Sequence, residues 1–301
     1  MHANPTDMCE PAVSRRNFLG AAAIGATAVL LPSLSDGAEK PQRWQMKLST
    51  STIQFTRLPV EEAFERIAKL GFDAVDVWSA HANCPHLDDV ANRLGAKGLV
   101  ECAKKNEIAL YAYSVYRGGY PKYAKLIGEA GGGVAIHGAT KACKPAELTA
   151  KMKAYLESMT PEIELAEQYD SYIALENHGG NILNTLDGLK AFVDNNKSKR
   201  LGIALAPFHL QGAKVPVPEA ISVVGDQLFF FYAWQRAKGT EQLPGIGPTD
   251  FTPWIAALAE IDYKWYVNPF MHHEPEPDAM VEALEKSRQY LLDNYERACP
   301  A

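Results

Sequence analysis

The sequence has no run rich in lysine or arginine, and its acidic side chains outnumber its basic ones. Lys and Arg total 30 and Asp and Glu total 36 in 301 residues, which gives a formal charge of −6 at pH 7. A nucleic-acid-binding protein needs a basic stripe that faces the phosphates. The charge pattern therefore argues against nucleic acid as a partner and favours a small molecule.

The chain also has few cysteines and no close cysteine pair such as Cys-x-x-Cys. After residue 40 the cysteines are Cys84, Cys102, Cys143 and Cys299. Closely spaced cysteines are the pattern that indicates a redox motif or a thiolate metal site. Because this pattern is missing, we expect ordinary buried or free thiols.

The apolar segment near the N-terminus is too short to cross a membrane. It spans residues 20–31, whereas a membrane-spanning helix needs about 20 apolar residues. Arg15 and Arg16 stand shortly before it, and the arrangement resembles a twin-arginine export signal, a bacterial route that carries folded proteins. We therefore predict that residues 1–40 are a signal peptide with a short linker.

This leader predicts an exported, periplasmic protein that uses the twin-arginine export machinery and keeps no stable membrane span after processing. Ser33, Ser35 and Ala38 are small residues that offer cleavage points, although none forms a clean Ala-x-Ala pattern. No cysteine directly follows the apolar segment to accept a lipid. A membrane anchor is the alternative interpretation of the same segment.

The rest of the chain has the length of one barrel domain. Removing the leader leaves roughly 260 residues, close to the ~250 typical of a (β/α)8 barrel. Short β-rich runs alternate with amphipathic helical stretches, which is typical of α/β folds. The eight predicted strands span residues 47–55, 74–78, 108–113, 133–137, 172–176, 201–205, 227–233 and 264–267. We predict a single-domain (β/α)8 TIM barrel over residues 45–301.

The helix between the first two strands has the clearest pattern. Val60, Phe64 and Ile67 recur at helical spacing, and Gly71 is expected to end this helix as a C-cap residue. A long helical pattern before the fifth strand is expected to break at Pro161, because proline disrupts a helix interior.

Candidate site residues lie just after the strands, because the loops at the C-terminal ends of barrel strands surround a shared pocket. Strand five ends at Glu176, followed by His178, and His209 follows strand six. A carboxyl at the end of an apolar strand is costly unless it has a partner or a task. The other candidates at these ends are Trp78, Trp234, Gln235, Arg236, Asn268 and His272.

Several of these motifs resemble one family. The Leu-Glu-Asn-His run over residues 175–178, His209 after strand six, the loop over residues 243–251 and the leader resemble the sugar phosphate isomerase/epimerase family of xylose-isomerase-like TIM barrels. The resemblance covers essentially the whole mature chain. It implies an isomerase or epimerase of carbohydrate metabolism.

The resemblance also implies a divalent metal, held by a Glu ending strand five, an Asp ending strand six, a His in strand seven and a Glu ending strand eight. Only Glu176 has the family's residue. The other three positions carry Ala206, Phe230 or Tyr232, and Asn268. One carboxylate does not hold such an ion at useful affinity, so we predict a degraded metal site.

A different metal site is the alternative. His178, His209, His272 and His273 could group near Glu176 and form a new His/Glu ligand set.

The family's chemistry, as the resemblance implies, is proton abstraction next to a carbonyl through an enediolate. Such chemistry needs a positioned base and a group that stabilises the enediolate oxygens. We predict Glu176 as the base and His209 as the acid or oxyanion donor. The family's second catalytic Glu is replaced by Asn268, which argues against an ordinary epimerase.

The remaining candidates have two interpretations each. Trp78 and Trp234 either stack on a sugar face or simply pack. Arg236 beside Gln235 either meets a substrate anion or is solvated. Export favours an unphosphorylated sugar or sugar acid, because sugar phosphates are concentrated in the cytoplasm.

Two function classes stay open at this point. The first is an enzyme acting on a carbohydrate by isomerisation, epimerisation or a related elimination. The second is a sugar-binding protein that kept the barrel and its aromatic rim but lost the reaction. An endonuclease with this architecture is set aside, because it needs a basic groove. The sequence leaves the oligomeric state open, a homo-oligomer included.

Overall fold

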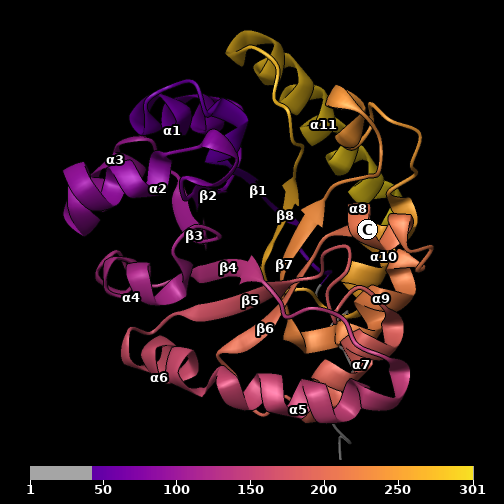
Figure 1. Cartoon of the computed structure of the whole chain (residues 1–301). Coiled ribbons are helices and arrows are strands. Elements are labelled where there is room, and N and C mark those ends of the chain that lie inside the picture. The colour runs from indigo at the N-terminus through magenta and orange to yellow at the C-terminus, as the bar shows by residue number, and fades with distance from the viewer. Residues whose placement is uncertain (1–42, 301) are drawn as a thin grey trace, which may run out of the picture. The chain divides into compact units, whose positions relative to one another are not determined.

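Eight parallel strands form a closed barrel in which each strand pairs with the next along the chain and β8 pairs with β1 (Figure 1). The structure is a computed structural model and describes residues 43–300. The predicted leader over residues 1–40, with its arginine pair and its cleavage points, lies outside the described residues.

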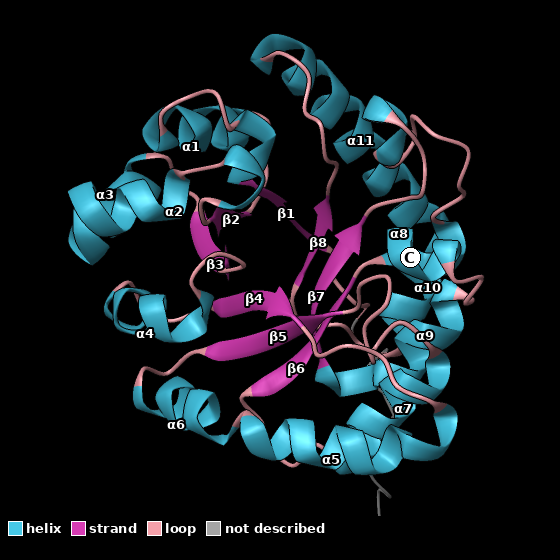
Figure 2. Ribbon diagram, viewed as in Figure 1, coloured by secondary structure: helices cyan, strands magenta, loops and turns pink. Residues whose placement is uncertain are grey.

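The strands alternate with helices, and Figure 2 shows the helices around the outside of the strands. The strands are β1 (Lys47–Ser51), β2 (Ala74–Trp78), β3 (Ala109–Ser114), β4 (Val134–Gly138), β5 (Tyr172–Glu176), β6 (Leu201–Leu205), β7 (Leu228–Ala233) and β8 (Tyr266–Pro269). The helices are α1 (Val60–Lys69), α2 (His86–Asp89), α3 (Gly95–Lys105), α4 (Gly119–Glu129), α5 (Leu148–Ser158), α6 (Thr160–Gln168), α7 (Leu186–Asn195), α8 (Pro207–Gly212), α9 (Val217–Val224), α10 (Thr252–Glu260) and α11 (Pro277–Ala298). The predicted (β/α)8 TIM barrel is confirmed.

The first strand is shorter than predicted. It ends at Ser51, and residues Thr52–Phe55 form a short 3-10 helix. All four of these residues are buried, and the Thr52 hydroxyl accepts the backbone N–H of Trp78 at 3.1 Å. The apolar, β-branched composition that suggested a strand instead reflects the burial of this turn against the barrel.

The two predicted helix boundaries, at Gly71 and at Pro161, are found in the structure. α1 is followed by Gly71, whose φ of 76° lies in the left-handed region that glycine adopts without strain. The long helical pattern is divided into α5 and α6, with Pro161 in the first turn of α6, where its missing N–H costs nothing.

The closing seam of the barrel joins the two ends of the described chain. β1 pairs with β8 through Lys47 with Tyr266 and Leu48 with Val267. Beside the seam, the indole N–H of Trp44 donates to the carbonyl of Tyr263 at 2.6 Å. Side-chain hydrogen bonds from Thr50 Oγ1 to the carbonyl of Pro269 and from Asn268 Nδ2 to Ser51 Oγ add to the backbone pairing of the two strands.

Residues alternate between two apolar cores along each strand. On β5, Ile173 and Leu175 belong to the core between strands and helices, whereas Ala174 points into the barrel. Small inward residues leave room for large ones, and the rings of Tyr111 and Phe230 stack there with centroids 5.4 Å apart. The same alternation turns Glu176, two residues after Ala174, toward the inside at the barrel's end.

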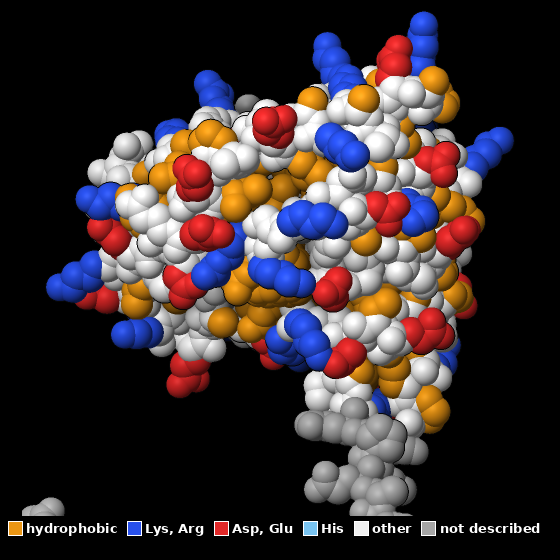
Figure 3. Space-filling model, turned by 90° about the horizontal axis from the view of Figure 1, so that it is seen from below, with side chains coloured by type: hydrophobic (Ala, Val, Ile, Leu, Met, Phe, Trp, Pro, Cys, Tyr) orange, Lys and Arg blue, Asp and Glu red, His pale blue; other side chains and the backbone are white. Residues whose placement is uncertain are grey.

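The surface charge, the cysteines and the helices of the described residues can be compared with what the composition predicts. Basic and acidic side chains are interspersed over the face seen in Figure 3. Cys84, Cys102, Cys143 and Cys299 are free thiols, the first two of them buried. Between residues 43 and 300, no helix is long and apolar enough to cross a membrane.

Replacing Phe64 with Ala is expected to destabilise the barrel by about 3–5 kcal/mol, because its fully buried ring on α1 would leave a cavity. Glu65→Ala is the matched control on the same helix, since Glu65 is exposed, and should change stability by less than about 0.5 kcal/mol. Urea unfolding checks both. Equal effects of the two variants would contradict the placement of α1.

Candidate active site

A cavity of ≈ 550 Å³ lies at the C-terminal ends of the strands, a size usual for small-molecule sites. It is lined by Trp78, His81, Tyr116, Gly138, Glu176, His178, Phe208, His209, Tyr232, Trp234, Ala237, Lys238, Gly239, Gln242, Phe270, His272 and His273. Aromatic rings and histidines dominate this lining. Glu176 is the only carboxyl among these residues.

Glu176 is the central polar group of the cavity. It ends β5, between Gly138 of β4 and Ala204 of β6, and its residue is only 7% exposed. Burial raises the pKa of this carboxyl to about 7, while the hydrogen bond from Tyr116 and the charge of His178 oppose the rise. A carboxyl of this kind can both take and return a proton near neutral pH.

Two tyrosine hydroxyls form a pair against this carboxyl. The Tyr116 hydroxyl donates to Glu176 Oε2 at 2.8 Å and lies 3.1 Å from the hydroxyl of Tyr232. Because the Tyr116 proton is used on Glu176, Tyr232 donates to Tyr116. Burial raises the pKa of both phenols well above the usual value, so both stay protonated.

Tyr116 was missed by the sequence interpretation, although it stands two residues after β3. The strand-end rule that selected Glu176 applies to it as well. Tyr232 was considered only as a replacement for a metal-binding histidine. It points into the barrel from β7 and reaches the cavity.

His209 faces Glu176 from the first turns of α8. Its Nε2 lies 3.7 Å from Glu176 Oε1, too far for a direct hydrogen bond but close enough for both groups to contact one ligand atom. Burial, with smaller contributions from the charges of His178, His272 and Arg236, lowers the pKa of His209 to about 3. The imidazole is therefore neutral at pH 7 and acts as a hydrogen-bond donor rather than as a charged acid.

Aromatic rings form the walls. Trp78 stacks on Phe270 with ring centroids 5.5 Å apart, and Phe208 stacks on Trp234 at 4.3 Å. The indole N–H of Trp234 donates to Gln242 Oε1 at 2.8 Å. Gln242 also donates to the carbonyl of His272 at 2.9 Å, so this buried amide, which the sequence interpretation missed, joins two loops of the site.

Three predicted site residues are absent from the lining. Gln235 is fully buried, and its amide holds the backbone of Leu243 and Thr249. Arg236 is exposed, with its guanidinium 5.4 Å from the ring centroid of Phe208. Asn268 is fully buried and donates to Ser51 Oγ at 2.9 Å. The other predicted candidates line the cavity together: Trp78, Glu176, His178, His209, Trp234 and His272.

The residues at the family's metal positions do not form a ligand set. Ala206 has no donor atom, Tyr232 is a protonated phenol, and Asn268 offers one neutral amide oxygen, Oδ1, which is buried without a partner while its Nδ2 donates to Ser51 Oγ. The four histidines of the alternative site all line the cavity, yet no three His, Cys, Asp or Glu side chains within residues 43–300 are arranged to hold a metal ion.

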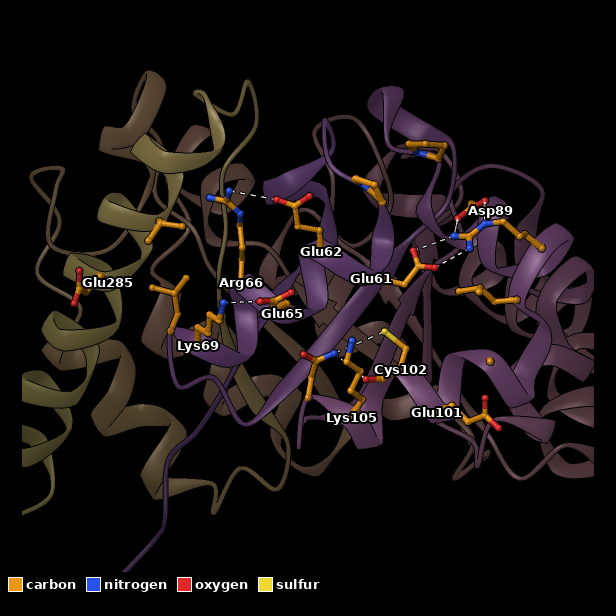
Figure 4. A pocket seen from close by; sticks show the side chains of 18 of the residues that line it. Glu61, Glu62, Glu65, Arg66, Lys69, Asp89, Glu101, Cys102, Lys105 and Glu285 are labelled. Atoms are coloured by element: carbon orange, nitrogen blue, oxygen red, sulfur yellow. Dashed lines mark hydrogen bonds and ion pairs between the residues drawn. The ribbon is translucent and has the colours of Figure 1, made fainter.

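A larger hollow of ≈ 1590 Å³ lies outside the barrel, along α1, α3 and α11 (Figure 4). Its charged side chains pair with one another, as Arg93 does with Glu61 at 2.7 Å and Arg66 with Glu62 at 3.3 Å. Ion pairs this exposed have ordinary surface energetics. The carboxyl groups of this hollow are not buried as Glu176 is in the inner cavity, so the inner cavity is the candidate site.

With this geometry established, the chain can be compared with known proteins. Residues 64–290 match the model of the xylose isomerase-like TIM barrel family, and the chain belongs to that family. No curated protein sequence matches the chain.

Solved structures with the same fold include several sugar enzymes. L-ribulose 3-epimerase has a TM-score of 0.65 at 14% identity, covering 84% of this chain and 96% of its own. The 3-keto-D-glucoside 4-epimerase YcjR of E. coli has a TM-score of 0.63 at 16% identity, covering 81% and 100%. The probable 3-DHS dehydratase AsbF of Bacillus anthracis has a TM-score of 0.64 at 14% identity, covering 80% and 98%. At these identities the likeness shows the fold.

The raised pKa of Glu176 predicts a measurable pH dependence of stability. The folded protein holds the proton up to about pH 7, whereas the unfolded chain releases it near pH 4.5. As pH rises from 4.5 to 7, the free energy of unfolding therefore falls because of Glu176. At ~1.4 kcal/mol per pKa unit, the total loss is about 3 kcal/mol. Glu176→Gln should gain stability relative to the unmodified protein between pH 4.5 and 7, as measured by urea unfolding.

His209→Gln should show the opposite sign. The pKa of His209 is lowered to about 3, so only the unfolded chain takes up this proton between pH 6.5 and 3. The unmodified protein therefore loses stability as pH falls, and the variant loses less. Parallel curves for both variants and the unmodified protein would contradict the burial of the Glu176–His209 pair.

Proposed function

We propose that this chain is an enzyme that acts on a carbohydrate by proton transfer next to a carbonyl, through an enediolate. The observation that carries the proposal is the buried Glu176 carboxyl, hydrogen-bonded by Tyr116 and facing the neutral ring of His209 across 3.7 Å. The sugar epimerases among the structural relatives support the substrate class.

Glu176 acts as the base. Its carboxylate takes a proton from the carbon next to the substrate carbonyl, and its pKa of about 7 suits proton exchange in both directions. The carbonyl oxygen then carries the developing negative charge. The proton of the adjacent hydroxyl passes to this oxygen, and return of the first proton from Glu176 to the former carbonyl carbon completes an isomerisation.

The charge on the enediolate oxygen is met by hydrogen-bond donors. The neutral ring of His209 offers an N–H beside Glu176. The Tyr116 hydroxyl, which donates to the Glu176 carboxylate before the reaction, becomes free to donate to the enediolate oxygen once Glu176 has taken the substrate proton, while Tyr232 donates to Tyr116. Neutral donors in a dry site stabilise oxyanions effectively, as a neutral histidine does in triosephosphate isomerase and a tyrosine in ketosteroid isomerase. These groups take the role that a divalent metal plays in related barrels.

A single carboxyl favours a one-base reaction. Ordinary epimerisation returns the proton from the opposite face and needs a second acid, and Asn268 stands at the position of the family's second glutamate. An isomerisation or an elimination is therefore favoured, and the dehydratase fold relative fits the latter. The buried histidines His209 and His272 are neutral at pH 7, and the lysine of the lining, Lys238, is exposed, so the inner part of the cavity favours an unphosphorylated sugar or sugar derivative.

The second candidate function is a sugar-binding protein without turnover. It is supported by the aromatic walls of Trp78, Phe208, Trp234 and Phe270, since flat rings stack well on sugar faces. The loss of the family's metal-binding residues at Ala206 and Asn268 favours it as well.

Hydrogen exchange from solvent separates the two functions. Sugars and keto sugars are incubated with the protein in D2O, and NMR follows the proton next to each carbonyl. The unmodified protein should exchange it, and Glu176→Gln should lower the rate by about 10²–10⁴-fold. Glu260→Gln, an exposed change on α10, is the matched control and should keep the rate.

Each other outcome is informative. A sugar that raises the melting temperature without any exchange supports the binding function and contradicts the enzyme. Equal rates for the unmodified protein and Glu176→Gln remove Glu176 as the base. Metal analysis after dialysis is made in parallel, and a near-stoichiometric metal that is lost in Glu176→Ala contradicts metal-free chemistry.

We further propose that the protein is exported through the twin-arginine route to the periplasm. Replacing Arg15 and Arg16 with lysines keeps the charge and should leave a full-length protein in the cytoplasm of a bacterial host, as checked by cell fractionation. Lys104→Arg with Lys105→Arg, exposed on α3, is the charge-conserving control. Periplasmic, shortened protein from the leader variant would contradict this route.

A further inference from the structure

Asp76 is a buried carboxyl that the proposed reaction does not use. It lies in the middle of β2 and points into the barrel, between the inward residues Ala74 and Trp78. Asp76 is fully buried and is absent from the cavity lining. None of the ion pairs within residues 43–300 involves it, so its charge has no cation to offset the cost of burial.

Three donors converge on one oxygen of this carboxyl. Oδ2 accepts the Ser51 hydroxyl at 2.7 Å, the Trp78 indole N–H at 2.7 Å and the Ser114 hydroxyl at 2.9 Å. The second oxygen, Oδ1, is buried without a partner. Burial raises the pKa of Asp76 to about 6 and these hydrogen bonds oppose the rise, so the group is ionised at neutral pH.

The bond to Trp78 has the largest consequence for the cavity. An indole has one polar atom, and a buried indole N–H needs a partner, so this atom decides how the ring is turned. The ring of Trp78 contacts Tyr116 at 5.3 Å, Phe270 at 5.5 Å and His272 at 5.9 Å between centroids. Rotation of the indole would disturb the whole aromatic wall on that side.

Asp76 also lies close to the hydroxyl groups that surround Glu176, through Ser114 and Tyr232. Burial and the charge of Glu176 raise the pKa of Tyr232 most, and the charge of Asp76 adds to the rise. Tyr232 in turn contacts the Tyr116 hydroxyl that holds Glu176. The Asp76 carboxylate is thus hydrogen-bonded to Trp78 in the cavity wall, and its charge also acts on Tyr232 of the Tyr116–Tyr232 hydroxyl pair.

We propose that Asp76 is a positioning residue, whose carboxylate holds the Trp78 indole in the orientation that forms the ligand-facing wall of the cavity. A serine or alanine at this position would avoid the cost of a buried charge. Asp76 acts through Trp78 and touches no ligand itself. The effect on turnover rests on the proposed function, whereas the orientation of Trp78 does not.

NMR of protein with ¹⁵N-labelled tryptophan tests the orientation directly. The chain has 5 tryptophans, and Trp78→Phe identifies the Trp78 indole signal. Asp76→Ala should shift this signal and leave the others near their positions. Asp76→Asn keeps an oxygen acceptor and should shift it less. Ser49→Ala is the matched control, because this buried hydroxyl on β1 has no partner, and it should leave the signal unchanged.

An unmoved Trp78 signal in a folded Asp76→Ala protein overturns the proposal. If that variant does not fold, the unmodified protein still decides, because a hydrogen-bonded, buried indole N–H must exchange slowly with D2O. A Trp78 N–H that exchanges as fast as a solvent-exposed indole overturns the proposal too.

Ligand binding gives the functional arm. With the sugar found in the exchange screen, Asp76→Ala should raise KM about 10-fold or more and leave kcat within about 3-fold, because a misplaced wall weakens binding first. An unchanged KM contradicts the positioning role for the ligand. A screen that finds no sugar at all contradicts the proposed function and leaves the NMR test of Asp76 standing.

Discussion

The burial of the Glu176 carboxyl without a cation is the constraint on which the site depends. The inside–outside alternation of β5 turns this side chain into the barrel, where water is excluded. A carboxyl so placed keeps its proton to about pH 7 and recruits donors, here the Tyr116 hydroxyl. The same exclusion of water keeps His209 neutral. The raised pKa of Glu176 and the neutral state of His209 are therefore both consequences of burial.

Charge on an oxygen, as the proposed reaction develops it, can be stabilised in two ways. A divalent ion with several oxygen or nitrogen ligands is one. Ala206, Tyr232 and Asn268 at the corresponding positions are consistent with the other, a set of neutral donors. Such donors stabilise charge less strongly than a metal but need no reorganisation and depend on no ion supply. Their strength depends on their orientation, which explains why buried polar groups such as Gln242 and Asp76 surround the walls.

Strand positions could be predicted because apolar alternation and turn residues are local signals, and strand ends locate the pocket in any barrel of this kind. The 3-10 turn after β1 could not, since its burial depends on β2 and on the loop after β8. Trp234 and Gln235 are adjacent in the sequence, yet only Trp234 lines the cavity. The side-chain amide of Gln235 is instead hydrogen-bonded to the backbone of Leu243 and Thr249 in the following loop. The alternation of β2 predicts that Asp76 points into the barrel, as Ala74 and Trp78 do. Its hydrogen-bond donors could not be predicted, because Ser51, Trp78 and Ser114 come from three different strands.

The seam between β1 and β8 has a consequence for synthesis. Among the eight strands, β1 leaves the ribosome first and its closing partner β8 leaves last. Until then the edge of β1 stays open, and an open edge invites pairing with other chains. The proposed export route, which accepts only folded cargo, would therefore have to wait until β8 has been synthesised.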